Sequence, residues 1–521
     1  MISPVIGGPP IASRPISPLW NSLALDRGAP RSLQDQIVEY FRAAVLEGRL
    51  KAGTRVPSSR ALAADHAVAR ITAVQAYERL VAEGYLASRP GSGLFVAESH
   101  PKHPARTVAA AARRAQARSR MPALKRSMPA LAMPPRPNES MPLATGIPAL
   151  DHFPWRDWAR ITARLHRERP LDALGHGDPQ GERVLREAIA QYLGAARGIS
   201  CGAEQILVIA GSQQGIDLTA RALARPGDAI WIEEPGYPVG RAALEAAALE
   251  RVPVPVDAEG IDVAAGARTA PAARLALVTP SHHYPLGFTM SLRRRLALLD
   301  WAEGADAWIL EDDYDGEYRY GGRPLAPLYT LDRGHRVLYL GTFSKVLAPG
   351  LRLGYLVVPA GAVDAFAALK AAADRHAPSL AQRVLARFIA EGRLAAHLRR
   401  MRGLYAGRRR ALLDALQREA AGVLQAFEAP EAGLHLVARL AVPVDDVAAS
   451  RRALEKRVYA APLSSYYAGI NRERGFVLGF ANTREDRMVP AVRSLVEAIE
   501  ASRPQMHQRK RTNSAAWQRT A

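Results

Sequence analysis

The chain has 521 residues, a formal net charge of +20 and a pI near 10.4. This length allows more than one domain and a large core, and the charge favours a polyanionic partner without indicating a fold. Cys201 is the only cysteine, which excludes an intrachain disulfide framework and a cysteine metal cluster, so no metal site is predicted. A reducing, cytoplasmic compartment fits this cysteine usage. No apolar stretch reaches about 18 residues and no basic segment precedes an apolar one near the start, so neither a membrane span nor a secretion signal is expected.

Residues 31–97 have the pattern of three helices followed by a β-hairpin. The first helix has apolar residues at helical spacing, Ser58 is placed to cap the second helix, and the third is expected over 71–83. A hairpin over 84–96 would form a small wing. Helix, turn, helix and wing is a geometry that sets one helix into a DNA major groove. The apolar face of the third helix is expected to consist of Val74, Tyr77, Leu80 and Val81.

The stretch from Gly48 to Ala97 is similar, nearly end to end, to the winged helix-turn-helix of GntR-family bacterial regulators. Arginines can bond phosphates or guanine edges, while hydroxyls and amides near helix starts favour phosphates. Ala69 stands where the family usually has serine, which removes one phosphate contact. The resemblance implies that operator DNA is contacted by Ser59, Arg60, Arg70, Thr72, Gly91, Ser92 and Gly93.

The composition changes abruptly over 98–140. Residues 99–138 include nine Lys or Arg and no Asp or Glu, among many Ala and Pro. Such a segment cannot bury enough apolar surface to offset its ordering entropy, so a linker is predicted. Its basic residues either add non-specific DNA affinity or belong to a solvated spacer. Residues 1–30 are interpreted as an N-terminal extension, and the basic tail 503–521 is expected to be disordered.

Residues 141–502 contain short apolar runs that each end in polar or glycine-rich residues. Near-continuous apolar strands separated by helix-like stretches indicate a mostly parallel sheet buried on both faces, and so an α/β domain. In such a sheet the ligand lies beyond the carboxyl ends of the strands, where these polar clusters fall. The clusters are therefore expected to converge on one site. The runs are 205–210, 229–232, 275–279, 307–310 and 336–340.

A lysine set between hydroxyls and near an arginine follows the last of these runs. These clusters resemble those of fold-type I pyridoxal 5'-phosphate (PLP) enzymes of the aminotransferase class. The resemblance implies that Lys345 forms the internal aldimine, for which its amine must be partly neutral, as burial and nearby cations favour. The cofactor phosphate would then be bound by Thr342, Ser344 and Arg352, and by Ser212 and Gln213 at the start of an expected helix, where amides and dipole suit a dianion.

Three further residues match positions that contact the cofactor ring in this class of enzymes. Asp312 would pair with the pyridinium nitrogen and keep it protonated, so that the ring acts as an electron sink. Tyr314 would hydrogen-bond the phenolate oxygen of the ring, and Tyr237 would stack on its face. Each residue alone also fits a structural role, Asp312 as a turn cap and Tyr237 as part of the core.

Other positions depart from the enzyme pattern. His176 stands where aminotransferases commonly have a tyrosine that reaches the neighbouring subunit's phosphate, and we expect His176 to bind the cofactor in its place. Tyr284 replaces the asparagine that usually contacts the ring oxygen. The strand over 475–480 carries no arginine to clamp a substrate carboxylate. The nearby arginines, which fit such a bidentate clamp or equally a surface charge, are Arg472, Arg474 and Arg484.

The order of winged helix, long linker and aminotransferase-like domain is that of the MocR subfamily of GntR regulators, and the chain is identified as a member by this resemblance. It implies a homodimer with PLP on Lys345 that responds to an amine, an amino acid or PLP itself. An amine would form an external aldimine. It would alter DNA affinity only if it bound two states of the dimer with different affinities. One alternative is a working aminotransferase with a tethered DNA-binding domain. Another is a dimerisation domain without cofactor, against which the presence of Lys345, Asp312 and Arg352 argues.

Overall fold

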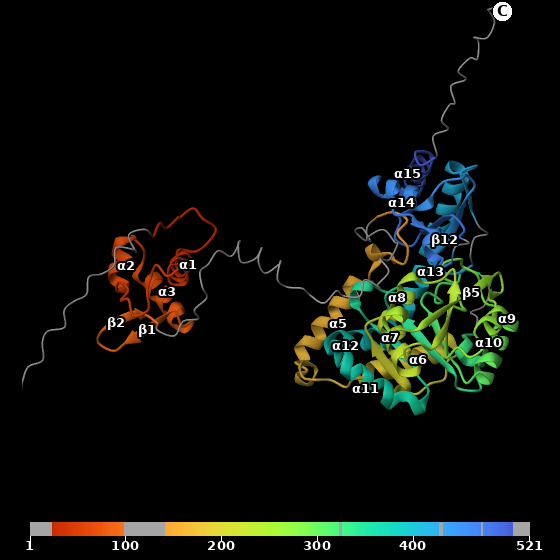
Figure 1. Ribbon diagram of the computed structural model, residues 1–521, viewed down its shortest axis with the longest axis horizontal. Coiled ribbons are helices and arrows are strands. Elements are labelled where there is room, and N and C mark those ends of the chain that lie inside the picture. The colour runs from red at the N-terminus through yellow and green to blue at the C-terminus, as the bar shows by residue number, and fades with distance from the viewer. Residues whose placement is uncertain (1–22, 98–140, 322–325, 427–430, 470–471, 504–521) are drawn as a thin grey trace, which may run out of the picture. The chain divides into compact units, whose positions relative to one another are not determined.

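The computed structural model describes residues 23–97, 141–321, 326–426, 431–469 and 472–503. They belong to two compact units, divided between Lys125 and Arg126, and each unit is described by itself (Figure 1). The predicted linker over 98–140 and nearly all of the predicted tail, 504–521, lie outside the described residues.

The first unit is a winged helix-turn-helix, as predicted. Its core packs the three helices together, with the Phe41 and Tyr77 rings edge to face at 5.5 Å. The Ser58 side chain accepts a hydrogen bond from the Ala61 amide at 3.1 Å, so the predicted cap of the second helix is confirmed. The elements are α1 (Leu33–Leu46), α2 (Ser59–Asp65), α3 (Arg70–Ala82), β1 (Leu86–Arg89) and β2 (Gly93–Val96).

The predicted apolar face of α3 is correct only in part. Tyr77 and Leu80 are buried, but Val81 is 37% exposed, and that prediction is wrong. Ala73 and Ala76 are buried in its place, because α3 packs against both α1 and α2 and small side chains allow the two close approaches. Leu23, from the predicted N-terminal extension, also joins this core.

The second unit is built on an eight-stranded sheet, mostly parallel as predicted. The order across the sheet is β3-β10-β9-β8-β7-β4-β5-β6. β10 runs antiparallel to both of its neighbours, and the short β6 is antiparallel to β5. The carboxyl ends of the other strands therefore lie along one edge. The strands are β3 (Ile206–Ile209), β4 (Ala229–Glu234), β5 (Glu250–Asp257), β6 (Gly260–Ile261), β7 (Leu275–Val278), β8 (Trp308–Asp313), β9 (Val337–Thr342) and β10 (Gly354–Val357).

Helices cover both faces of this sheet, which explains why its strands are apolar at nearly every position (Figure 1). On one face, the side chains of α7, α8 and α11 pack against the strands. On the other face, α9 and α10 pack at one end, and α5, α6 and α12 pack at the other. The helices are α5 (Trp155–Glu168), α6 (Arg183–Arg197), α7 (Ser212–Leu223), α8 (Pro238–Ala246), α9 (Val263–Thr269), α10 (Leu292–Gly304), α11 (Val363–Asp374) and α12 (Ser379–Ala390).

A smaller C-terminal part packs on the same core as α5, α6 and α12. Its four-stranded antiparallel sheet has the order β11-β12-β14-β13. Within the ranges described above, no helix is long and apolar enough to cross a bilayer. The elements are α13 (Arg393–Glu419), β11 (Leu424–Ala426), β12 (His435–Leu440), α14 (Asp446–Glu455), β13 (Ala461–Pro462), β14 (Gly475–Gly479) and α15 (Met488–Glu500).

Candidate functional site

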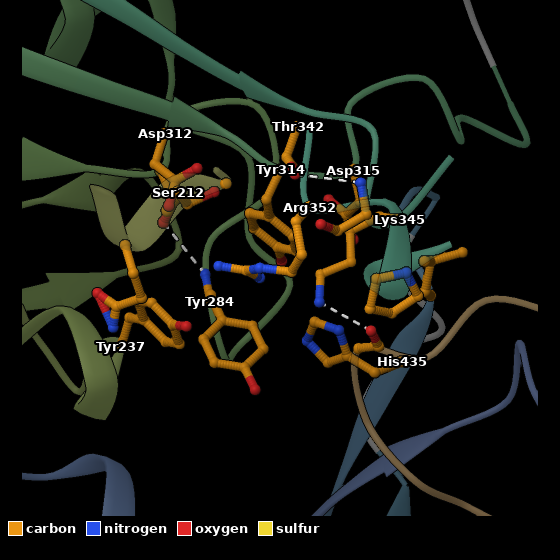
Figure 2. Close-up of a pocket in the computed structure, with 17 residues that line it drawn as sticks. Ser212, Tyr237, Tyr284, Asp312, Tyr314, Asp315, Thr342, Lys345, Arg352 and His435 are labelled. Atoms are coloured by element: carbon orange, nitrogen blue, oxygen red, sulfur yellow. Dashed lines mark hydrogen bonds between the residues drawn. The ribbon is translucent and has the colours of Figure 1, made fainter. Parts of the chain in front are cut away.

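A cavity of about 140 Å³ opens at the carboxyl ends of β3, β4, β7, β8 and β9 (Figure 2). Loops that follow parallel strands meet at this edge, which is where ligands of such sheets bind. Most of the residues predicted to bind a cofactor line this one cavity. They are Ser212, Gln213, Tyr237, Asp312, Tyr314, Thr342, Ser344, Lys345 and Arg352.

Lys345 enters the cavity from the turn after β9. Its Nζ donates a hydrogen bond to the carbonyl oxygen of Gly146 at 2.7 Å. The Thr342 hydroxyl accepts a hydrogen bond from the amide of Ser344 at 3.1 Å, which shapes the turn just before the lysine. The amine is thus held at one end of a half-buried side chain in a defined direction.

The start of α7 and Arg352 form a cationic end of the cavity. The first amides of a helix have no partner within that helix, and Ser212 and Gln213 occupy these positions. Gly211, just before them, has φ +105°, and a Cβ built on it would lie 3.5 Å from Nη1 of Arg352. The guanidinium therefore lies against this glycine, beside the helix start. The helix dipole and the arginine together suit a phosphate.

The carboxyl group of Asp312 is buried and lines the cavity. Burial, and after it the neighbouring Asp313, raise the pKa of Asp312 to about 7, against the opposing effect of Lys345. Asp313 is itself held by ion pairing with Arg197 and by a hydrogen bond from the Tyr339 hydroxyl at 2.6 Å. Among the described residues, Oδ1 of Asp312 has no hydrogen-bond partner. A buried, unpaired carboxyl oxygen facing a cavity suits a cationic N–H group of a ligand.

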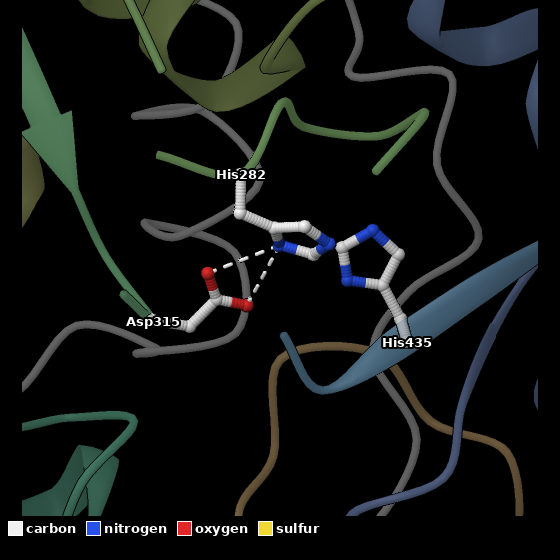
Figure 3. A group of neighbouring side chains, drawn as sticks. All are labelled: His282, Asp315 and His435. Atoms are coloured by element: carbon white, nitrogen blue, oxygen red, sulfur yellow. Dashed lines mark hydrogen bonds and ion pairs between the residues drawn. The ribbon is translucent and has the colours of Figure 1, made fainter. Parts of the chain in front are cut away.

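Tyr314 is oriented by a histidine and a second aspartate. His282 Nδ1 lies 3.1 and 3.2 Å from the two carboxylate oxygens of Asp315 (Figure 3), and 2.9 Å from the Tyr314 hydroxyl. A carboxylate only accepts hydrogen bonds, so Nδ1 carries a proton and cannot accept one from the tyrosine. The hydroxyl proton of Tyr314 is therefore free to point elsewhere, as a donor toward a ligand in the cavity.

Tyr237 and Tyr284 form an aromatic wall. Their rings meet edge to face at 5.8 Å, and the Tyr284 hydroxyl lies 3.1 Å from that of Tyr466. The Tyr284 amide donates to the Thr279 hydroxyl at 3.1 Å, and that hydroxyl donates at 2.6 Å to the carboxyl group of Glu233. Burial raises the pKa of Glu233 to about 8, and the hydrogen bonds from Thr279 oppose that rise.

Sequence reasoning missed a buried cluster beside Lys345. Oxygen or nitrogen atoms of His282, Asp315 and His435, one from each, lie within 4.8 Å of one another (Figure 3). Asp315 and His435 line the cavity. The three residues come from the loop after β7, the loop after β8 and the start of β12, so no local spacing could have predicted the cluster. These side chains have metal-ligating atoms, although no metal site was predicted.

The structure does not bring the remaining candidates to the cavity. His176 is exposed and does not line it. The three arginines near β14 also lie elsewhere: Arg472 donates to the Gly469 carbonyl at 2.7 Å, Arg474 to the Val444 carbonyl at 3.3 Å, and Arg484 pairs with Asp486 at 3.2 Å. These arginines are close in sequence to a strand that was expected to border the ligand site, but their side chains bind other partners.

The predicted DNA-contacting residues lie on the surface of the first unit. Arg60 and Arg70 are exposed, and neither has a hydrogen bond or an ion pair with another described residue. The wing residues Gly91, Ser92 and Gly93 are exposed, while Ser59 and Thr72 are half-buried. No side chain caps α3, whose N-cap is Ala69, so the first amides of this helix are open to a phosphate.

Comparison with known proteins agrees with this two-part organisation. Residues 138–495 match aminotransferases of class I and II, and residues 33–96 match bacterial regulatory proteins of the gntR family. The chain is 39% identical over 482 residues to the probable rhizopine catabolism regulatory protein MocR of Rhizobium meliloti, covering 92% of this chain and 96% of that protein. It is 33% identical over 480 residues to the pyridoxine biosynthesis transcriptional regulator PdxR of Corynebacterium glutamicum, covering 92% and 98%.

Solved structures match the second unit. The kynurenine aminotransferase of Pyrococcus horikoshii, solved with PMP, superposes with a TM-score of 0.64 at 30% identity, covering 70% of this chain and 91% of that one. An aminotransferase-like unit thus follows a gntR-type DNA-binding unit in a single chain, as in full-length relatives that are transcriptional regulators. The chain therefore belongs to the MocR subfamily of gntR-family transcriptional regulators.

Proposed function

We propose that the chain is a PLP-dependent regulator whose DNA binding responds to an amine, an amino acid or PLP itself, recognised at Lys345. The observation that carries the proposal is the convergence of three unlike groups on one cavity: the Lys345 amine, the unpaired oxygen of Asp312, and Arg352 beside the start of α7. These groups complement the aldehyde, the pyridinium N–H and the phosphate of PLP. When bound, PLP supplies an aldehyde carbon that exchanges one primary amine for another.

The other residues of the cavity support this placement. The Tyr314 hydroxyl, whose proton does not point to His282, would donate to the phenolate oxygen of the ring. Tyr237 offers an aromatic face. Thr342 and Ser344 would add hydroxyl groups to the phosphate site. The matching structure of the Pyrococcus horikoshii kynurenine aminotransferase contains PMP, the amine form of the same cofactor, and this also supports the proposal.

The proposed assembly is a homodimer that binds double-stranded operator DNA. The resemblance assigns His176 to the neighbouring subunit's cofactor, and His176 is exposed. It follows Leu171 and Leu174, which are 79% and 72% exposed. Large apolar side chains that are this exposed to solvent are typical of a surface that contacts another protein chain. Arg60 and Arg70 supply free guanidinium groups for phosphates or base edges.

The test is the visible absorption spectrum of the full-length protein with PLP, before and after addition of amines and amino acids. The proposal predicts a band that requires Lys345, is lost in Lys345→Ala and is kept in the surface control Lys456→Ala. Binding to a duplex selected from a random library should then change with the same compound that shifts the band. A spectrum that is the same in Lys345→Ala as in the wild type would refute the assignment.

The second candidate function is an active aminotransferase. It is favoured by the 30% identity to an aromatic-amino-acid aminotransferase of Thermococcus litoralis and by the presence of Lys345, Asp312 and Arg352 in one cavity. It predicts repeated turnover of an amino acid with a keto acid. The regulator predicts a spectral shift with at most slow turnover, so measuring keto-acid release separates the two.

A further inference from the structure

The charges that line the cavity leave no cation for the effector, if PLP binds as proposed. Among the described lining residues, the charged side chains are Lys345, Arg352, Asp312 and Asp315. The proposed function assigns Arg352 to the phosphate, and Asp312 balances the pyridinium. Lys345 holds the aldehyde until the effector amine displaces it, and the released amine can again donate to the carbonyl oxygen of Gly146. Asp315 alone remains, and its charge is negative.

Strand β14, as part of the described chain, brings no cation to the cavity. Val477 packs in the apolar cluster that includes Tyr284 and Tyr466, whereas its neighbours Phe476 and Leu478 belong to the core on the opposite face of the strand. Tyr284 lines the cavity, so Val477 occupies the β14 position on the cavity side. A valine at that position presents no charge to a carboxylate.

The wall beside Lys345 is instead made of hydrogen-bond acceptors. Nε2 of His435 lies 2.9 Å from the carbonyl oxygen of Pro285, which only accepts, so Nε2 carries the proton and Nδ1 is an acceptor. Burial and His282 lower the pKa of His435 to about 3, so the ring is neutral. The carboxylate of Asp315 receives one N–H from His282 and retains further lone pairs (Figure 3). A second carboxylate brought here would meet like charge in a buried site, which is unfavourable.

We infer that the effector is a primary amine without a carboxylate or other anionic group, whose hydroxyl or N–H groups donate to Asp315 and His435. This inference rests on the proposed function, because it takes the amine to react at Lys345 and the phosphate to occupy Arg352. It excludes ordinary α-amino and ω-amino acids as the tightest ligands.

The test compares matched pairs on the full-length, PLP-loaded protein: 2-aminoethanol against glycine, 3-aminopropan-1-ol against 3-aminopropanoate, and 2-aminopropane-1,3-diol against serine. Each pair differs mainly in the carboxylate. The dissociation constant is read from the shift of the Lys345-dependent absorption band. We expect the amino alcohol to bind at least about tenfold more tightly in each pair, which is about 1.4 kcal/mol. An amino acid that binds as tightly as its alcohol, or more tightly, overturns the inference while leaving the sensor intact.

A variant identifies the group responsible. Asp315→Asn keeps the size of the side chain and removes its charge, so the preference for the alcohol should fall severalfold, mainly through tighter binding of the amino acid. The surface variant Asp486→Asn should leave the preference unchanged. The comparison of ligands on the wild-type protein needs no variant, so poor folding of Asp315→Asn does not hide the answer. If no amine of either kind shifts the band, the inference fails, and the proposed function is reduced to sensing of PLP itself.

Discussion

Replacement of Asp312 by asparagine should stabilise the cofactor-free protein at pH 8 and weaken PLP binding. Both effects have the same origin: a carboxyl group buried without a partner for Oδ1. In the cofactor-free protein the ionised form is costly, because burial raises the pKa of Asp312 from 3.8 to about 7. With PLP bound, the same charge would pair with the pyridinium.

The size of the first effect follows from this pKa. A rise from 3.8 to about 7 makes the ionised form less stable in the folded protein by roughly 4 kcal/mol at pH 8. Asparagine removes that cost but buries an amide, at about 1–3 kcal/mol if its N–H groups stay unpaired. The expected net gain is therefore about 1–3 kcal/mol at pH 8. For the second effect, a hydrogen bond to a charged group contributes about 1.5–3 kcal/mol, so PLP should bind roughly 10- to 150-fold more weakly.

The pH dependence of the free energy of unfolding tests separately whether Asp312 destabilises the folded protein at pH 8. Since the folded pKa of Asp312 is the higher one, its contribution is favourable below about pH 4 and is lost as the pH rises toward 7. Urea unfolding of the cofactor-free proteins at pH 5 and pH 8 should show a larger loss of stability in the wild type than in Asp312→Asn. Glu311 and Glu317 also have raised pKa values, but Asp312 is not among the causes, so their contributions cancel in the comparison. Burial raises the pKa of Glu233 and the charge of Asp312 adds to that rise, so the variant removes the latter contribution as well. Equal losses in the two proteins, or unchanged PLP affinity, would refute the reasoning.

Three further predictions concern the DNA surface, the packing beside the cavity and the dimer. Arg70→Ala should weaken operator binding by about 1–3 kcal/mol in a DNA titration if Arg70 contacts a base. The control Arg49→Ala, at an arginine paired with Glu47, should leave the affinity unchanged. Equal losses of affinity in the two variants would contradict the assigned surface. Gly433→Ala should cost at least about 1–2 kcal/mol in urea unfolding, because φ is +83° and the added methyl overlaps the ring of His282; a stability equal to that of the wild type would contradict this packing. Leu171→Asp should lower the dimer fraction in sedimentation, and an unchanged fraction would remove the short 3-10 helix Leu171–Leu174 from the proposed interface.

Much of the site was predictable because its residues belong to contiguous patterns. Lys345 follows an apolar strand and lies near hydroxyls, and Asp312 lies near the carboxyl end of another such strand. Parallel strands buried on both faces have near-continuous apolar sequences, so their ends are visible in the chain, and the sheet brings those ends together. The winged helix was predictable for the same reason, with Ser58 as its cap.

Side-chain directions were less predictable. Helical spacing predicted that Val81 lies on the buried face of α3. Because α3 contacts two helices at once, Ala73 and Ala76 are buried instead. Closeness in sequence made Arg472 and Arg474 candidates for a carboxylate clamp. Their hydrogen bonds to backbone carbonyls hold them away from the cavity, and sequence spacing carries no information about such partners.

The sequence by itself determined the two-part organisation, the strand ends and the residues proposed to bind PLP, since each of these depends on residues close together in the chain. Only the tertiary structure decided what surrounds the proposed effector site. His282, Asp315 and His435 come from three separate segments and meet inside the protein. Their hydrogen-bond partners set which ring nitrogens carry protons, and this leaves an acceptor-rich wall. Hydrogen-bonding roles and pKa values depend on neighbours brought together by folding, and local sequence does not specify those neighbours.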